Sequence, residues 1–102
     1  MHGMKTRLKH MVRMQLPNCP SYFVEEVALR MATLPDMRQL LNMKKQPKKM
    51  LFRTIEKTSL DVIRHQLTDY DDLLDVKGMT RDEARLIVED EVLEQFHQWA
   101  GS

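Results

Sequence analysis

The 102-residue sequence has little cysteine, glycine and aromatic content, and it has no long apolar run. Its single cysteine, Cys19, cannot form an internal disulfide, and no apolar segment follows the basic N-terminus, so we expect an intracellular protein. No apolar run approaches the roughly 20 residues needed to cross a bilayer, so no contact with a membrane is expected. The three glycines are far apart in the sequence, which excludes a glycine-rich phosphate-binding loop.

The length and the spacing of apolar residues predict a single all-α domain. A chain of 102 residues can bury one modest core but not two independent ones. Apolar residues recur at helical spacing over residues 21–34, 48–66 and 80–99, and nowhere do they alternate as in β-strands. We therefore predict a compact, irregular helical bundle of about four to five helices over residues 16–100, preceded by a basic arm or helix at residues 1–15.

Capping residues and apolar stripes add detail to this prediction. Three caps are predicted: Asp36 before a short helix at 37–43, Thr68 with Asp71 before a second short helix, and Thr80 with Glu83 before the C-terminal helix. Several large apolar residues are expected to face the core, among them Met31, Leu34, Met37, Met50, Phe52 and Ile87. Tyr22 is the one aromatic residue that is expected to be exposed.

Charge is distributed unevenly, although the formal net charge is only +1. Residues 1–57 contain 12 lysines and arginines against 4 acidic residues, whereas residues 58–102 contain 4 against 11. Residues 1–16 have no acidic residue and place their apolar residues on one side, which resembles a mitochondrial presequence but fits a basic arm better. We expect a cytoplasmic location, with a mitochondrial or nuclear one left open.

The basic residues form two clusters, one in the N-terminal arm and one around Pro47, that predict contact with nucleic acid. Cations that neutralise several phosphates release counterions, which gives affinity without sequence preference. Because aromatic side chains for base stacking are few, contacts with the phosphate backbone of DNA or RNA should dominate. The predicted binding residues are Lys5, Arg7, Lys9, Arg13, Lys44, Lys45, Lys48, Lys49 and Arg53.

Two other functions are compatible with the sequence. The opposite charges of the two halves would suit a protein-interaction module, including one in which the basic half of one copy binds the acidic half of another. An enzyme acting on an anionic substrate is the third hypothesis, with His65 as general acid or base beside Tyr70, Asp71 and Arg85. No second histidine or nucleophile completes a catalytic or metal-binding pattern, so the sequence favours a non-enzymatic protein without metal or cofactor.

The segment from Arg64 to Leu74 places many polar residues between two predicted helices. Arg64 and His65 would suit the negative end of one helix dipole, and the three aspartates that follow Thr68 would suit the positive end of the next. The segment therefore predicts a rigid joint between helices, and this interpretation competes with that of a reactive site.

The same segment resembles the signature of a protein family. The residues that carry the resemblance are Arg64-His65, Thr68, Tyr70-Asp71, Leu73-Leu74, Gly78, Arg81, Ala84-Arg85 and Trp99. Their order is similar to the RH-x2-T-x-Y-D-x-L-L motif, glycine, R-x2-A-R helix and tryptophan of an uncharacterised family of bacterial and fungal proteins. The resemblance covers residues 16–99 and implies a shared domain without an assigned activity. The chain differs at Val62, where the family often has a second histidine, and at the lysine cluster, which replaces a glycine- and arginine-rich segment.

Overall fold

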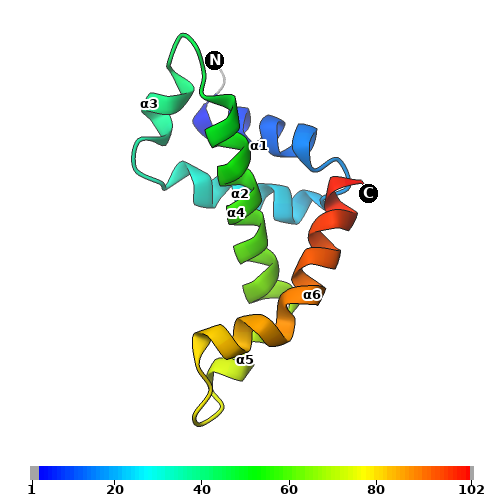
Figure 1. Ribbon diagram of the computed structural model, residues 1–102. Coiled ribbons are helices and arrows are strands. Elements are labelled where there is room, and N and C mark those ends of the chain that lie inside the picture. Colours follow the sequence, from blue (N-terminus) through cyan, green and yellow to red (C-terminus); the bar gives the residue numbers. More distant parts are fainter. Residues whose placement is uncertain (1–2, 102) are drawn as a thin grey trace.

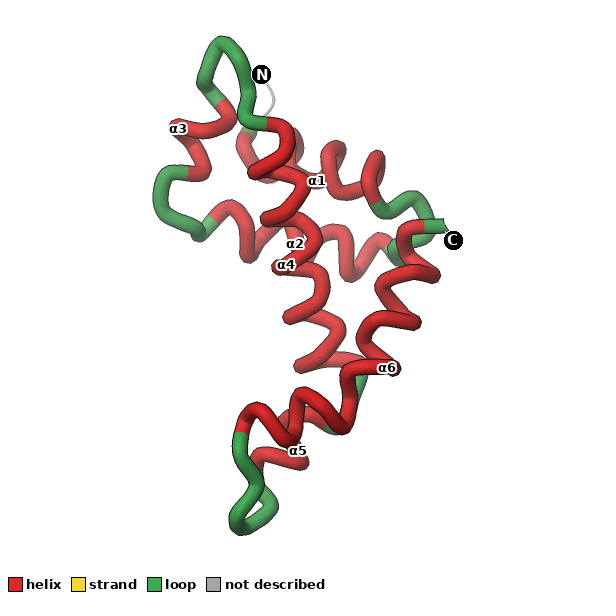
Figure 2. The backbone as a smooth tube through the Cα atoms, viewed as in Figure 1, coloured by secondary structure: helices red, strands yellow, loops and turns green. Residues whose placement is uncertain are grey.

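Six helices form the regular structure of residues 3–101, which are the residues that the computed structural model describes (Figure 1). They are α1 (Met4–Gln15), α2 (Ser21–Ala32), α3 (Met37–Leu41), α4 (Lys48–Leu67), α5 (Tyr70–Leu74) and α6 (Arg81–Ala100). Helices and loops account for this whole range and no strand occurs in it (Figure 2), so the predicted all-α fold is confirmed. The N-terminal segment, expected as an arm or a helix, is helix α1.

The helix boundaries follow local capping chemistry. Pro20 and Pro47 directly precede α2 and α4, where a residue without an N–H removes no helical hydrogen bond. Thr80 and Glu83 form the predicted capping box of α6, in which each side chain accepts the backbone N–H of the other residue, at 3.1 and 3.2 Å. Gly101 ends α6 with a φ of 88°, in the left-handed region that favours glycine.

Asp36 precedes α3 as predicted, but within the described residues its side chain does not cap that helix. Its φ of 68° is left-handed, whereas a capping residue usually has an extended backbone that directs its side chain to the first N–H groups. The first turn of α3 is closed by the backbone instead, where the N–H of Leu40 donates to the carbonyl of Asp36 over 2.9 Å. The prediction of a side-chain cap at Asp36 was therefore wrong.

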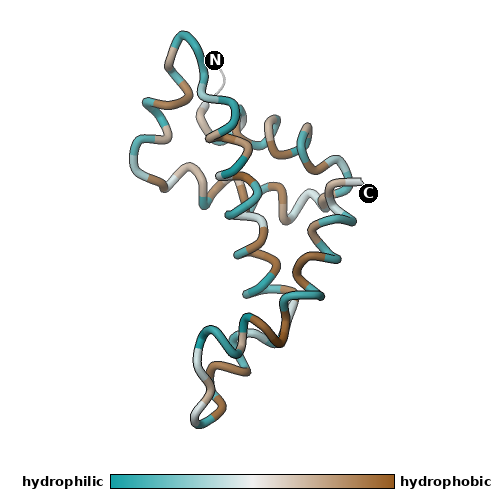
Figure 3. The backbone as a smooth tube through the Cα atoms, in the orientation of Figure 1, coloured by the Kyte–Doolittle hydropathy of each residue, from teal (hydrophilic) through white to brown (hydrophobic). Residues whose placement is uncertain are grey.

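The apolar core is built around α4, which contacts both α2 and α6. Leu51, Ile55 and Ile63 on the inner face of α4 are fully buried. Helix α1 packs along α2, and its Leu8 and Val12 are buried in the same core. Apolar segments, brown in Figure 3, recur along these helices between polar ones. One side of each long helix is thereby used for packing, and the remaining sides are free to carry function.

The C-terminal end of α6 returns to the turn between α1 and α2 (Figure 1). The backbone N–H of Asn18 donates to the carbonyl of Trp99 over 3.0 Å, and its side-chain amide donates to the carbonyl of Gln98 over 3.2 Å. The rings of Trp99 and Phe23 lie 5.3 Å apart between centroids. The molecule extends 48 × 28 × 22 Å, with the loop before α4 and the turn before α6 at opposite ends.

Some of the residues that were expected in the core are exposed, among them Phe52 and Ile87. Phe52 is 48% exposed and Ile87 is 58% exposed. A helix turns by about 100° per residue, so the neighbours Leu51 and Val88, which are buried, direct these two side chains away from the interior. Tyr22 is exposed as predicted, at 59%. The exposure of Phe52 and Ile87 depends on which turns of a helix contact a neighbouring helix, and the spacing of apolar residues along the sequence does not specify those turns.

Ser59 is a polar residue on the buried face of α4. Its side chain is fully buried, and its hydroxyl has no hydrogen-bond partner among residues 3–101. A buried hydroxyl without a partner has lost its hydrogen bonds to water and gained none in return.

We expect Ser59→Ala to raise the free energy of unfolding by about 1 kcal/mol, because it removes this unpaired group and alanine favours a helix. Chemical denaturation of both proteins measures the difference. Thr58→Ala is the matched control. It changes helix propensity in the same direction, but Thr58 is less buried than Ser59, so this substitution should have a smaller effect on the free energy of unfolding. A loss of stability in Ser59→Ala would show that the hydroxyl has a partner after all.

Candidate functional site

An open groove of about 1560 Å³ lies beside α4 and residues 42–47, which we call the lysine loop. Seven basic residues line it: Arg7 from α1, Lys44 and Lys45 from the lysine loop, and Lys48, Lys49, Arg53 and Lys57 from α4. Asp61 is the one acidic residue among the described residues of the lining. This basic groove brings together six of the nine residues that the sequence predicted as a binding set.

Arg7 reaches the basic groove because its guanidinium binds the end of α3. Nη2 donates to the carbonyl of Leu41 over 2.6 Å, and Nη1 donates to Oδ1 of Asn42 over 3.2 Å. The side-chain amide of Gln46 donates to the same Leu41 carbonyl over 3.0 Å. These bonds satisfy a carbonyl that the last helical turn leaves without a partner, and they hold both ends of the lysine loop.

The α4 side of the basic groove follows the helical repeat. Lys49, Arg53 and Lys57 recur every four residues, so their Cα atoms form one row that rises by about 6 Å from each to the next. These three side chains are exposed. A row of exposed cations on one helix can contact several negative charges of one extended ligand.

Aliphatic side chains lie among the cations of the basic groove. Leu34, Met43 and Met50 line it and are 41%, 46% and 53% exposed. Leu34 and Met50 were expected in the core, and that prediction was wrong, whereas Met31 and Met37 are buried as predicted. Leu34 lies beyond the last turn of α2 and Met50 lies in the first turn of α4, where few neighbouring helices remain to cover them.

The other three predicted arm residues, Lys5, Lys9 and Arg13, are not among the described residues that line the groove. The ammonium of Lys5 donates to Glu25 Oε1 on α2 over 2.6 Å, between side chains that are about half exposed. This hydrogen bond, together with the charges of Lys5, Lys9 and Arg13, holds the pKa of the Glu25 carboxyl below its ordinary value. The arm is therefore divided, with Arg7 in the groove and the other three cations near Glu25.

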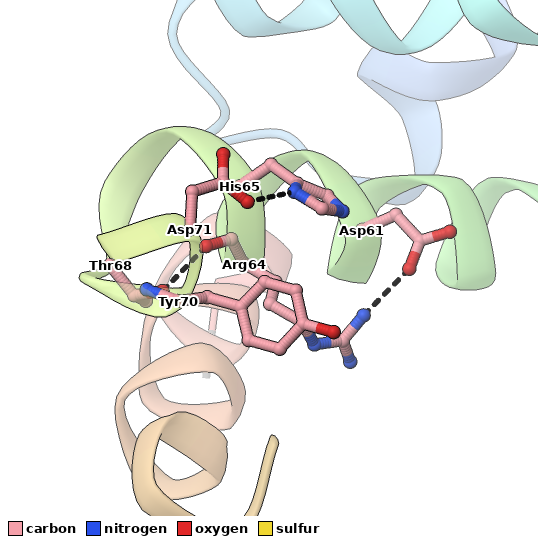
Figure 4. A network of polar contacts seen from close by, with 6 residues as sticks. All are labelled: Asp61, Arg64, His65, Thr68, Tyr70 and Asp71. Atoms are coloured by element: carbon pink, nitrogen blue, oxygen red, sulfur yellow. Dashed lines mark hydrogen bonds and ion pairs between the residues drawn. The ribbon is translucent and has the colours of Figure 1, made fainter. Parts of the chain in front are cut away.

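Polar contacts among its own residues hold the joint between α4 and α5 (Figure 4). Thr68 Oγ1 donates to the carbonyl of Arg64 over 2.5 Å and accepts the N–H of Tyr70 over 3.2 Å, so one hydroxyl bridges the two helices. His65 Nδ1 and Asp71 Oδ1 lie 2.7 Å apart, and since a carboxylate only accepts, Nδ1–H donates. Asp71 thus pairs with His65 and does not complete the predicted capping box with Thr68.

Tyr70 fills the space between Arg64 and His65 and is 4% exposed. Its ring meets the His65 ring edge to face, with centroids 5.2 Å apart, and the Arg64 guanidinium lies 5.9 Å from its centroid. Arg64 also donates to Asp61 over 2.6 Å. Of the four catalytic candidates, Arg85 lines a separate hollow whose lining includes none of His65, Tyr70 and Asp71.

That hollow, of about 420 Å³, lies between α4 and α6 and was not predicted from the sequence. Its lining residues are Leu60, Arg64, Asp82, Arg85, Leu86, Glu89, Val92 and Leu93. The apolar residues of α6 were assigned to a single stripe facing the core. Leu86 and Leu93, seven residues apart and outside that stripe, were the available signal.

The remaining reactive groups do not form a site in the described part of the chain. No group of three or more histidine, cysteine, aspartate or glutamate side chains within residues 3–101 could hold a metal ion. Burial raises the pKa of the Cys19 thiol to about 12, which keeps it protonated and weakly nucleophilic at neutral pH. None of the helices in this range combines the length and apolar character that a membrane span requires.

Comparison with known proteins identifies a family. The family model DUF2293, described as an uncharacterized conserved protein, matches residues 11–100, and the chain therefore belongs to this family. No curated protein and no solved structure matches the chain. The expected membership in a family without an assigned activity is confirmed, while the motif from Arg64 to Trp99 as its signature stays a prediction.

We expect Thr68→Val to lower the free energy of unfolding by about 1–3 kcal/mol, because it leaves the N–H of Tyr70 without its partner. Denaturant unfolding measures this effect. Thr54→Val is the matched control: its hydroxyl only donates to the Met50 carbonyl within α4, over 2.8 Å, so its removal should cost less. Equal effects of the two substitutions would contradict a bridging role for Thr68.

We expect Lys5→Met to raise the pKa of Glu25 toward its ordinary value, as measured by NMR titration of the carboxyl group. A lowered pKa stabilises the fold above the unfolded-state pKa, and this contribution disappears as the pH falls through the folded-state pKa. The variant should therefore lose a little stability at neutral pH and none at low pH. Lys77→Met, in the turn between α5 and α6, is the control and should leave the pKa of Glu25 unchanged.

Proposed function

We propose that this member of the DUF2293 family binds nucleic acid through the phosphate backbone, in the basic groove. The supporting observation is the composition of the lining, with seven basic residues and Asp61 as the one acid among the described residues. Phosphate neutralisation by clustered cations releases counterions from the nucleic acid, which favours association at low salt. Sequence-independent binding of DNA or RNA follows from this chemistry.

The spacing of the cations supports an extended ligand. The row of Lys49, Arg53 and Lys57 is about 12 Å long, since it covers eight residues of helix. A duplex strand places a phosphate about every 3.4 Å along its axis, so the row matches roughly three to four consecutive phosphates. Lys44 and Lys45 of the lysine loop add positive charge beside this row.

Base recognition has little support. The exposed aromatic residues Tyr22 and Phe52 are not among the described residues that line the basic groove. Stacking on aromatic rings is the usual source of affinity for unpaired bases. Contact with the backbone, to which Lys5, Lys9 and Arg13 of α1 would add from outside the groove, is therefore the mode that we propose.

The apolar part of the lining favours a second candidate, an acidic amphipathic segment of a protein partner. Leu34, Met43 and Met50 lie partly exposed among the cations, and a phosphate backbone would leave them without apolar contact. A helix with one acidic and one apolar side would use both features of the groove. This candidate corresponds to the protein-interaction module considered from the sequence.

We expect the chain to bind a duplex oligonucleotide at about 50 mM salt, with an affinity that falls steeply as salt rises. The variant in which Lys44, Lys45, Lys48 and Lys49 become glutamine should bind at least about tenfold more weakly. Its plot of log affinity against log salt should be shallower by about 3 to 4, at roughly 0.9 for each phosphate that is no longer neutralised. Fluorescence anisotropy at several salt concentrations measures both quantities.

Two comparisons distinguish the groove from a general effect of charge. Lys44→Gln with Lys45→Gln should weaken binding more than Lys77→Gln with Arg81→Gln, which removes equal charge from residues that do not belong to the described lining of the groove. Met43→Asn with Met50→Asn should leave nucleic-acid affinity nearly unchanged, but it should weaken the binding of an acidic peptide. Undetectable binding of DNA and RNA at low salt would refute the proposal.

A further inference from the structure

The outer face of α6 carries large apolar side chains that the fold leaves uncovered. Leu86 is 70% exposed and Leu93 is 39% exposed. They are seven residues apart, so they lie on the same side of α6, away from the stripe of Ala84 and Val88 that packs inward. With Leu60 of α4 they line the hollow between α4 and α6.

Charged residues of both signs alternate beside these leucines. Asp82, Arg85 and Glu89 line the same hollow and are exposed. Arg85 and Glu89 lie four residues apart, one on each side of Ile87 along the helix. This order of charge is self-complementary. If a second α6 helix runs in the opposite direction, Arg85 of each helix lies opposite Glu89 of the other.

We propose that this face, formed by α6 and the adjoining part of α4, binds the same face of a second copy of the chain. The two α6 helices run antiparallel about a two-fold axis near Ile87. Arg85 of each copy then pairs with Glu89 of the partner subunit, and the two Leu86 side chains meet near the axis, over the 420 Å³ hollows. Apolar contact supplies the affinity, and the charge pairs determine the direction.

Charge complementarity selects a second copy as the occupant. A parallel arrangement of two α6 helices would place Arg85 opposite Arg85 and Glu89 opposite Glu89, which like-charge repulsion disfavours. The antiparallel arrangement is isologous and closes at two copies. Docking of the basic half of one copy on the acidic half of another is heterologous and would allow longer assemblies.

This interface is independent of the proposed nucleic-acid contact. The linings of the hollow and of the basic groove have no residue in common among the described residues. A dimer would present two basic grooves to one ligand, and neither groove requires the other in order to form. Self-association can therefore be tested in the absence of nucleic acid.

The test is a charge exchange followed by sedimentation velocity of the full chain. The unmodified protein should form a dimer as its concentration rises. Arg85→Glu alone places two carboxylates opposite each other in each pair, and Glu89→Arg alone places two guanidinium groups there, so each variant should dimerise at least about tenfold more weakly. In a mixed dimer of the two variants, each pair joins a carboxylate of one chain with a guanidinium group of the other, so mixing the two variants should restore the dimer.

The double variant, with Arg85→Glu and Glu89→Arg in the same chain, restores opposite charges in both pairs and should again form a dimer. Its recovery, compared with the two single variants, measures the coupling between positions 85 and 89. A mixture of the double variant with the unmodified protein identifies contacts between chains, because a mixed dimer would pair like charges. The two proteins should therefore each form dimers with themselves and avoid mixed dimers.

Two further variants separate the apolar contact from the charges. Leu86→Gln should abolish the dimer without charge reversal, and Glu91→Arg, an exposed change elsewhere on α6, should leave it intact. Circular dichroism confirms that each variant is folded. The inference is overturned if the unmodified protein is a monomer at all concentrations, or if the double variant stays monomeric. The first result would also be obtained if a different partner occupied this face.

Discussion

Burial of one face of α4 is the constraint on which the rest of the structure depends. A helix of 20 residues with mixed composition gains most of its stability from packing, so it must bury an apolar face. Leu51 and Ile55 lie fully inside, and α4 contacts both α2 and α6. Helical geometry then leaves Arg53 and Lys57 on the side of the basic groove, and Arg64 on the side of the hollow. Both candidate surfaces are therefore consequences of how this single helix is packed.

One ion pair lies between the basic groove and the hollow. Asp61 lines the basic groove and Arg64 lines the hollow, and they are joined by a 2.6 Å contact between Arg64 Nη1 and Asp61 Oδ1. The acidic side chain in the groove is thus neutralised by a cation from outside it. Since the Arg64 side chain is 16% exposed and lies against the Tyr70 ring, its position is held by packing as well as by charge. The groove keeps most of its positive charge although it includes an aspartate.

Local patterns predicted the helices well because their causes are local. Periodicity indicated the extents of α2, α4 and α6, and the capping box at Thr80 is confirmed by its hydrogen bonds. The exposure of Phe52 and Ile87 was not predictable in this way, because it depends on where along a helix a neighbour is in contact. The separation of Arg7 from the other three cations of α1 was not predictable for the same reason. Glu25 of α2, which pairs with Lys5, lies beside α1 only in the folded chain.

The polar motif and the basic residues differ in how their partners are distributed, and this difference decides which of them is available for a ligand. The side chains of His65, Thr68 and Asp71 each bond to another member of their own segment, and Tyr70 is enclosed by its neighbours. These contacts fix how α5 follows α4, and helix α5 in turn contacts α6. A dense polar motif thus serves the geometry of the fold. Cations such as Lys49 instead project from elements held by other bonds, so a ligand can engage them without disturbing the core.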